Sequence, residues 1–143
     1  MNGASGLPLA LAADRLNLYS GTVHHVWDGD TVYCLLWSPV DQHYVLTGCR
    51  IRGTQAPELG KDPGAEQVRD FLTTRLPVGE RVVVHDVGPY PRAGHITCSL
   101  TMADGTDLAS WLLERGYAAA WDGRGRKPVV PWPPTTAQEA DHA

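Results

Sequence analysis

Two short segments of this chain hold the residues whose types and spacing could do chemistry. Residues 28–32 read Asp-Gly-Asp-Thr-Val, and a second segment runs from Arg50 to Glu58. Carboxylates such as those of the first segment are the ligands that a hard divalent cation prefers. A guanidinium group matches the oxygens of a phosphate, and a glutamate can take a proton from water. Together these residue types predict metal-assisted attack on a phosphate.

Each of these residues also has a purely structural interpretation. Asp28 and Asp30 flank a glycine, which is typical of a hairpin turn whose carboxylates bond to local backbone N–H groups. Glu58 could be an ordinary solvated acid in a loop. Arg50 could be a strand-end cation, and alternation places Arg52 on the same face, so the pattern alone does not separate the two arginines. The offset in sequence to Glu58 favours Arg50.

The elements that must position these residues are mostly short strands. Asp28-Gly29 indicates a hairpin turn, because glycine tolerates a positive φ, and residues 38–42 form a second turn. His24 and His25 are neighbours on a strand, so alternation places them on opposite faces and predicts structural or solvent roles rather than a shared metal site. Strands are expected at residues 18–37 on either side of the hairpin turn, 43–51, 81–85 and 94–102.

Two short amphipathic helices complete the expected architecture. The first is capped by Asp62, with Pro63 at its first position, and stops at Pro77; the second is capped by Thr106 and stops at Gly116. Their inner faces are expected to comprise Ala65, Val68, Phe71, Leu72 and Leu76 in the first and Leu108, Trp111 and Leu112 in the second. Five or six short strands with two helices predict a mainly β, α+β fold in which helices pack on a small β-barrel.

Composition limits the classes of function. The chain has 143 residues, enough for one domain with one core, and its net charge is -4. No global positive field therefore draws it to nucleic acid, and any phosphate binding must come from a local cluster of basic residues. The three cysteines cannot all pair within the chain and have no metal-ligand spacing, which favours a reduced, intracellular setting. No apolar run approaches the length of a membrane span, so no membrane partner is expected.

The chain divides into three parts by composition. Residues 1–17 are expected to form an N-terminal arm, 18–122 the folded domain, and 123–143 a Pro-rich and basic C-terminal tail. The tail carries Arg124, Arg126 and Lys127 between Trp121 and Trp132. Such a segment is either a solvated tail or a surface that holds the backbone of a nucleic acid.

The order of four fragments resembles the staphylococcal nuclease (thermonuclease-like) family. The fragments are residues 28–32, Arg50 with Ala56-Pro57-Glu58, residues 90–92 (Tyr-Pro-Arg), and 103–108 leading into 112–118. The resemblance covers roughly residues 20–122. It implies an oligonucleotide-binding-type (OB-fold-like) five-stranded barrel with packed helices. It also implies calcium-dependent hydrolysis of phosphodiester bonds in DNA or RNA.

The resemblance assigns residues to a metal site. Asp30 corresponds to the main calcium ligand, and Asp28 supports the metal shell. Ala56 would contribute its backbone carbonyl. Gln55 stands where the family usually has a second calcium carboxylate, and an amide oxygen can still bind calcium with a smaller electrostatic attraction. Three outcomes are open at this position: weaker calcium dependence, a different preferred ion, or a pseudo-enzyme; reduced but real activity is the expectation.

The resemblance also assigns residues to the substrate. Arg50 and Arg92 would contact the phosphate under attack, Tyr90 would contact the substrate, and Glu58 would orient or deprotonate the attacking water. Pro91 replaces a glycine that is usual in the family, and the stretch from Arg92 to the next turn is longer than expected. Either a longer hairpin absorbs the extra residues and leaves Arg92 in place, or Arg92 is a surface arginine.

The leading prediction is therefore a calcium-dependent nuclease, a hydrolase acting on DNA or RNA. The first alternative is a catalytically impaired OB-fold module that binds nucleic acid or a protein partner. The second is an interaction domain that has no role with nucleic acid. The sequence does not give the oligomeric state or the preference between DNA and RNA.

Overall fold

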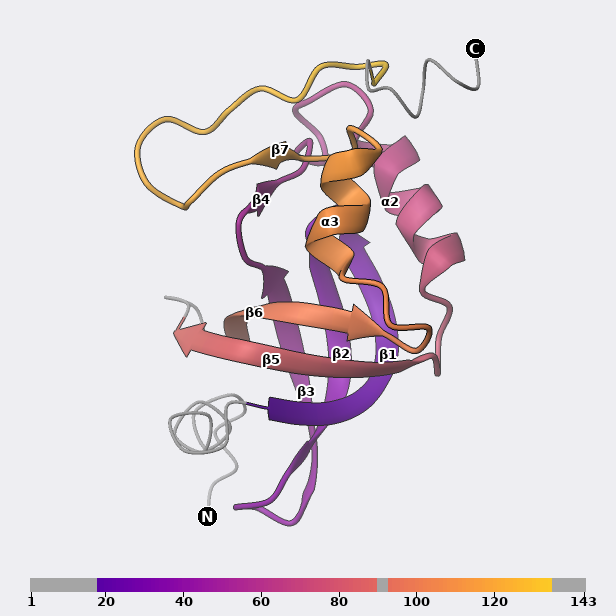
Figure 1. The fold of residues 1–143 in the computed structure, drawn as a ribbon, viewed down its shortest axis with the longest axis vertical. Coiled ribbons are helices and arrows are strands. Elements are labelled where there is room, and N and C mark those ends of the chain that lie inside the picture. Colours follow the sequence, from indigo (N-terminus) through magenta and orange to yellow (C-terminus); the bar gives the residue numbers. More distant parts are fainter. Residues whose placement is uncertain (1–17, 90–92, 135–143) are drawn as a thin grey trace.

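The computed structural model describes residues 18–89 and 93–134, in which five strands close into a barrel. Neighbouring strands follow the order β1-β2-β3-β6-β5, and every pair is antiparallel except β3 with β6 (Figure 1). The barrel strands are β1 (Leu18–Asp28), β2 (Thr31–Ser38), β3 (His43–Ile51), β5 (Arg81–Pro89) and β6 (His95–Met102). The expected α+β class, an OB-fold-like five-stranded barrel with two helices, is confirmed.

Period-two alternation builds the interior of the barrel. In β2, Val32, Cys34 and Leu36 are fully buried, while the residues between them point outward. The same pattern in β6 buries Ile96, Cys98, Leu100 and Met102. The three cysteines are free and buried, as expected for small apolar residues of strands.

Two helices and a small second sheet complete the described structure. Helix α2 (Ala65–Arg75) packs mainly against β1, and α3 (Leu108–Glu114) packs against β6 and β4. Strand β4 (Thr54–Gln55) pairs with β7 (Ala119–Ala120), so the chain after α3 returns beside the end of β3 (Figure 1). Within the described ranges, no helix has the length and apolar character needed to cross a membrane.

The predicted caps of both helices were wrong. The cap of α2 is Gly64, in a left-handed conformation with φ 86°, and no side chain caps it. Asp62 instead accepts a hydrogen bond from the backbone N–H of Glu58 at 2.9 Å. Asp107 rather than Thr106 caps α3, and its carboxylate accepts the N–H of Ser110. The two errors have different causes: α3 is preceded by two adjacent residues that can cap a helix, Thr106 and Asp107, whereas α2 begins at Ala65 after a glycine, so Pro63 precedes its cap and is not its first residue.

Two side-chain placements also differ from expectation. Phe71, predicted on the inner face of α2, is 45% exposed and stacks on Tyr117. His24 and His25 were placed on opposite faces by alternation, but their Nδ1 atoms lie 2.7 Å apart. A β-bulge between Val23 and His25 interrupts the alternation and brings the two rings together.

Candidate active site

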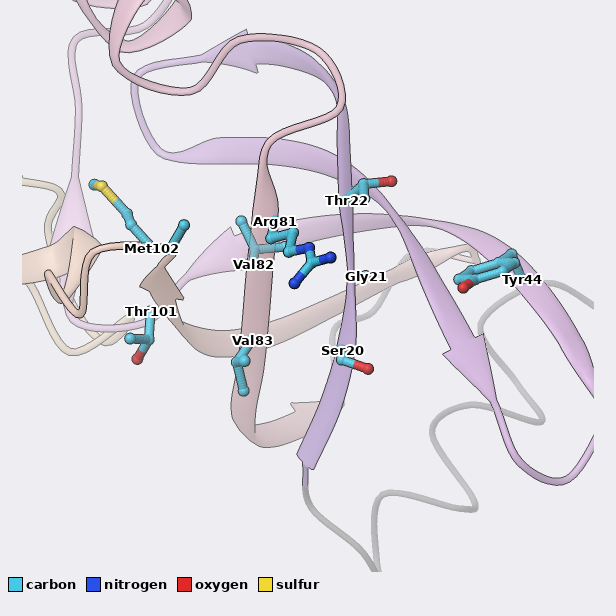
Figure 2. Close-up of a pocket in the computed structure, with 10 residues that line it drawn as sticks. Ser20, Gly21, Thr22, Tyr44, Arg81, Val82, Val83, Thr101 and Met102 are labelled. Carbon is cyan, nitrogen blue, oxygen red and sulfur yellow. The ribbon is translucent and has the colours of Figure 1, made fainter.

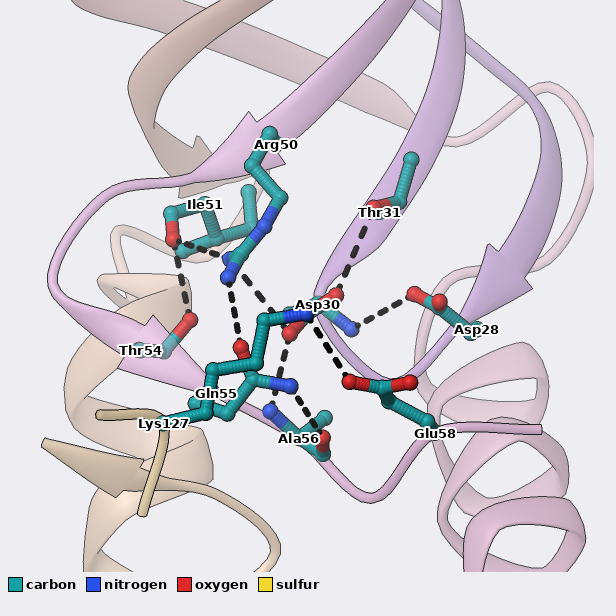
Figure 3. Close-up of polar contacts among 10 residues, drawn as sticks. All are labelled: Asp28, Asp30, Thr31, Arg50, Ile51, Thr54, Gln55, Ala56, Glu58 and Lys127. Carbon is teal, nitrogen blue, oxygen red and sulfur yellow. Dashed lines mark hydrogen bonds and ion pairs between the residues drawn. The ribbon is translucent and has the colours of Figure 1, made fainter. Parts of the chain in front are cut away.

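The hairpin turn between β1 and β2 places Asp30 at the centre of a polar cluster (Figure 3). Asp30 is 5% exposed, and its Oδ2 accepts the backbone N–H of Ala56 at 2.8 Å. The same oxygen lies 3.3 Å from Nη1 of Arg50, at the end of β3, and Oδ1 accepts the hydroxyl of Thr31 at 3.4 Å. The two sequence segments that suggested phosphate chemistry are thus brought together by the barrel.

Gly29 allows this turn to lie close to α2. A Cβ at Gly29 would lie 2.7 Å from the side chains of both Ala56 and Val68. The expected reason for this glycine, a positive φ, was wrong, because Gly29 is not among the residues with positive φ. Close approach of the turn to Ala56 and to the helix is what excludes a side chain here.

Gln55 links the remaining members of the cluster. Its Oε1 accepts a hydrogen bond from Nη2 of Arg50 at 3.2 Å, and its Nε2 donates to the carbonyl of Ala56 at 2.9 Å. Arg50 also donates through Nη1 to the carbonyl of Ile51 at 3.0 Å. The guanidinium therefore lies between the carboxylate of Asp30 and the amide of Gln55, with its side chain 14% exposed. Gln55 is itself 6% exposed, so the amide is an integral part of the site.

Asp28 borders the cluster and accepts the N–H of Asp30 at 3.1 Å. Burial is the largest effect on this carboxyl and, with the nearby charge of Asp30, it raises the pKa of Asp28 to about 7. Arg50 opposes the shift only in part. The two carboxylates of Asp28 and Asp30 repel each other, and a bound proton reduces this repulsion. A metal cation bound in place of the proton would reduce it as well.

The raised pKa of Asp28 predicts an unusual dependence of stability on pH. Between about pH 4 and 7 the folded chain keeps a proton on Asp28 that the unfolded chain releases, so the free energy of unfolding should fall as pH rises and level off above 7. Asp28→Asn should remove this decrease, and near pH 8 should be more stable than the unsubstituted protein by about 2–4 kcal/mol. Urea denaturation at pH 5 and 8 measures both effects, with the exposed Asp70→Asn as the control. If the free energy of unfolding changes equally between pH 5 and 8 in Asp28→Asn and in the unsubstituted protein, the pKa of Asp28 is not the cause of the change.

Glu58 follows the cluster in the sequence, and Figure 3 shows its side chain pointing toward the cluster from the loop before α2. Its Oε1 accepts a hydrogen bond from Nζ of Lys127 at 2.9 Å (Figure 3). On its other oxygen, Oε2, Nζ of Lys61 lies 3.9 Å away. The Glu58 side chain is 33% exposed. It is therefore accessible to water and lies between two cations.

Sequence reasoning assigned no individual role to Lys127. The only signal for it was the basic segment of the tail, Arg124 to Lys127, because a partner so far away in the chain leaves no local pattern. Arg52, the competitor of Arg50, donates instead to the carbonyls of Asp86 and Thr97 and is separate from the cluster. Tyr90 and Arg92 lie outside the described residues.

The described residues hold oxygen ligands but few charges for a metal ion. No three His, Cys, Asp or Glu side chains gather in the described ranges in a way that could hold a metal on their own. The oxygens available are the carboxylates of Asp28 and Asp30, the amide oxygen of Gln55 and the carbonyl of Ala56. The last two already accept hydrogen bonds, but each oxygen has a second lone pair. This all-oxygen set fits a hard cation such as calcium. Because position 55 provides a neutral amide and not a carboxylate, the set attracts the cation with less negative charge.

A surface depression of the described residues lies elsewhere. It measures about 630 Å³, is open to solvent, and lies over β1 and β5 beside residues such as Gly21, Tyr44 and Arg81 (Figure 2). Among the described residues, its lining contains no carboxylate or histidine, so they offer there no acid or base of the kind found in the Asp30 cluster. The cluster around Asp30 is the better candidate for chemistry.

No protein-family model matches this chain, and no curated protein matches it either.

Proposed function

We propose that this protein is a divalent-metal-dependent nuclease that hydrolyses phosphodiester bonds in DNA or RNA. The observation that carries the proposal is the meeting of Asp30, Arg50 and Gln55 in one buried hydrogen-bonded cluster beside the accessible carboxylate of Glu58. A phosphate-binding cation, an oxygen-rich cation site and a candidate base are the parts that such hydrolysis requires.

Arg50 is the group proposed to bind the phosphate. Its guanidinium is held in position by Asp30, Gln55 and the carbonyl of Ile51. Fixed donors of this kind stabilise the extra negative charge of the transition state because they need not reorganise during the reaction. In this proposal Arg92 adds a second cation and Tyr90 contacts the substrate.

Glu58 is proposed to take a proton from the attacking water. The water oxygen forms a bond to phosphorus, the bond to the leaving sugar oxygen breaks, and that oxygen is protonated by solvent. Asp30, Asp28, Gln55 and Ala56 would hold the cation, which is proposed to be calcium. When bound, this ion would withdraw charge from the phosphoryl oxygens.

A second candidate function is a binding module that retains the barrel without turnover. The observations that favour it are the neutral amide of Gln55 in the site and the ion pair that engages Glu58. This module would bind a nucleic acid and leave it intact under all ions.

The direct test is cleavage of labelled single-stranded DNA and RNA by the purified protein. Parallel reactions contain calcium, magnesium, manganese or EDTA. We expect cleavage with at least one divalent ion and none with EDTA. Intact substrates under every ion would reject the nuclease and, if the protein binds the same strands, would favour the binding module.

Restoring a carboxylate at position 55 should strengthen cation binding. Gln55→Glu keeps the size of the side chain and adds a negative charge next to Asp30, so calcium affinity should rise about tenfold, or about 1.4 kcal/mol. Calorimetric titration with calcium measures it, and Gln67→Glu on the exposed face of α2 is the matched control. Unchanged or weaker calcium binding by Gln55→Glu would show that the amide does not lie at a cation site.

A further inference from the structure

The chain after β7 forms a strap that contacts the candidate active site through Lys127 and Glu58. We define the strap as residues 121–134. It begins where the N–H of Trp121 donates to the carbonyl of Gly53 at 3.0 Å, next to the strand that carries Gln55 (Figure 1). It ends with Val130 buried and the ring of Trp132 packed on Gly64 so closely that a Cβ at Gly64 would lie 2.2 Å from that ring. Both ends of the strap are therefore attached to the barrel and its first helix.

The strap has a charge opposite to that of the whole protein. It contains the cations Arg124, Arg126 and Lys127 and one acid, Asp122, which gives a net charge of +2 in a chain whose net charge is -4. Asp122 accepts the backbone N–H of Arg124 at 2.8 Å rather than forming an ion pair with a side chain of the strap. All three cations are exposed. The strap is thus a local positive surface of the kind that the acidic composition requires for phosphate binding.

Lys127 connects this surface to the chemistry of the site. Its Nζ lies 2.9 Å from Oε1 of Glu58, while 56% of the Lys127 side chain remains exposed. Exposed ion pairs of this type contribute only about 0–1 kcal/mol, so a phosphate can compete for the ammonium group. An ammonium group also has three donors and can contact a phosphate while it keeps Glu58 in place.

We propose that the strap binds the phosphate backbone of single-stranded nucleic acid and that Lys127 positions the strand and Glu58 relative to each other. This inference rests on the proposed nuclease function and names the second phosphate-binding surface of that site. Lys127 holds a phosphate beside Glu58, and Arg124 and Arg126 hold the backbone further along the strap.

Binding is measured first, without cleavage. Fluorescence anisotropy of a labelled single-stranded DNA oligonucleotide is recorded in EDTA between about 50 and 200 mM salt. Arg124→Gln/Arg126→Gln should weaken binding about tenfold at the lowest salt and reduce the slope of log K against log salt by about 1.4, because two phosphate contacts are lost. The control, Arg69→Gln/Arg81→Gln, removes the same charge from α2 and β5 and should change the slope by less than about 0.3. Equal effects of the two double variants, or no binding by the unsubstituted protein, would overturn the inference.

Kinetics then test the position of Lys127. Lys127→Gln should raise KM for the oligonucleotide about fivefold or more. Lys127→Arg should keep KM close to that of the unsubstituted protein, because an arginine at this position can also contact phosphate. Faster cleavage by Lys127→Gln would overturn the inference and identify Lys127 as an inhibitory contact on Glu58. An unchanged KM would also overturn it. If the unsubstituted protein binds the strand through the strap but cleaves with no ion, the nuclease proposal fails while the strap assignment holds.

Discussion

Asp30→Asn is expected to lower the free energy of unfolding by about 2–4 kcal/mol and to reduce metal-stimulated cleavage about a hundredfold or more. The loss of stability follows from the burial of the pair: the side chains of Asp30 and Arg50 are 7% and 14% exposed. Removing one partner leaves a nearly buried guanidinium without its counter-charge. Cleavage falls for two reasons. The carboxylate of Asp30 orients the guanidinium of Arg50, and the substitution removes a fixed negative charge from the proposed cation site.

A double variant separates the two consequences of Asp30→Asn. Asp30→Asn/Arg50→Met removes both charges and should regain part of the lost stability, since no unpaired cation remains, but it should not regain cleavage. Urea denaturation and the cleavage assay measure the two properties independently. Asp70→Asn removes a carboxylate from an exposed ion pair with Arg69 and should change stability by less than about 1 kcal/mol. A fully stable Asp30→Asn would show that the buried pair does not hold the site together.

The barrel was predictable from the sequence because local patterns determine it. Alternation of apolar residues marked the strands, and the Asp28-Gly29 turn joined the first two in the correct hairpin. The helix positions also followed from spacing, while their caps did not, because Thr106 and Asp107 compete at the start of α3 and Gly64 begins α2 without a side-chain cap. The bulge at His24 was missed because it adds a residue to one strand and leaves no mark in the hydrophobic pattern.

The candidate site was predictable only in part. Asp30, Arg50, Gln55 and Ala56 lie within two short segments whose order suggested that they meet, and the structure brings them together. The contact between Lys127 and Glu58 joins residues far apart in the chain, and only the folded backbone defines it. The role of Gly29 as a point of close packing likewise depends on the position of α2.

Glu58→Gln is expected to reduce cleavage about a hundredfold or more while leaving the fold intact. An amide of the same size cannot take a proton from water. The ion pairs of Glu58 with Lys127 and Lys61 are exposed, so their loss should change the free energy of unfolding by less than about 1 kcal/mol. Thermal unfolding and cleavage are measured on the same preparation, and Glu66→Gln in the first turn of α2 is the matched control.

Glu58→Gln should also bind single-stranded DNA at least as tightly as the unsubstituted protein does. The substitution removes a negative charge next to the strap and frees Lys127 from its carboxylate partner, and both changes favour a phosphate at this position. Tight binding with little cleavage would place the loss in the chemical step rather than in substrate recognition. Equal cleavage by Glu58→Gln and the unsubstituted protein would remove Glu58 from the reaction. The contact with Lys127 would then fasten the strap to the loop before α2 without a part in the reaction.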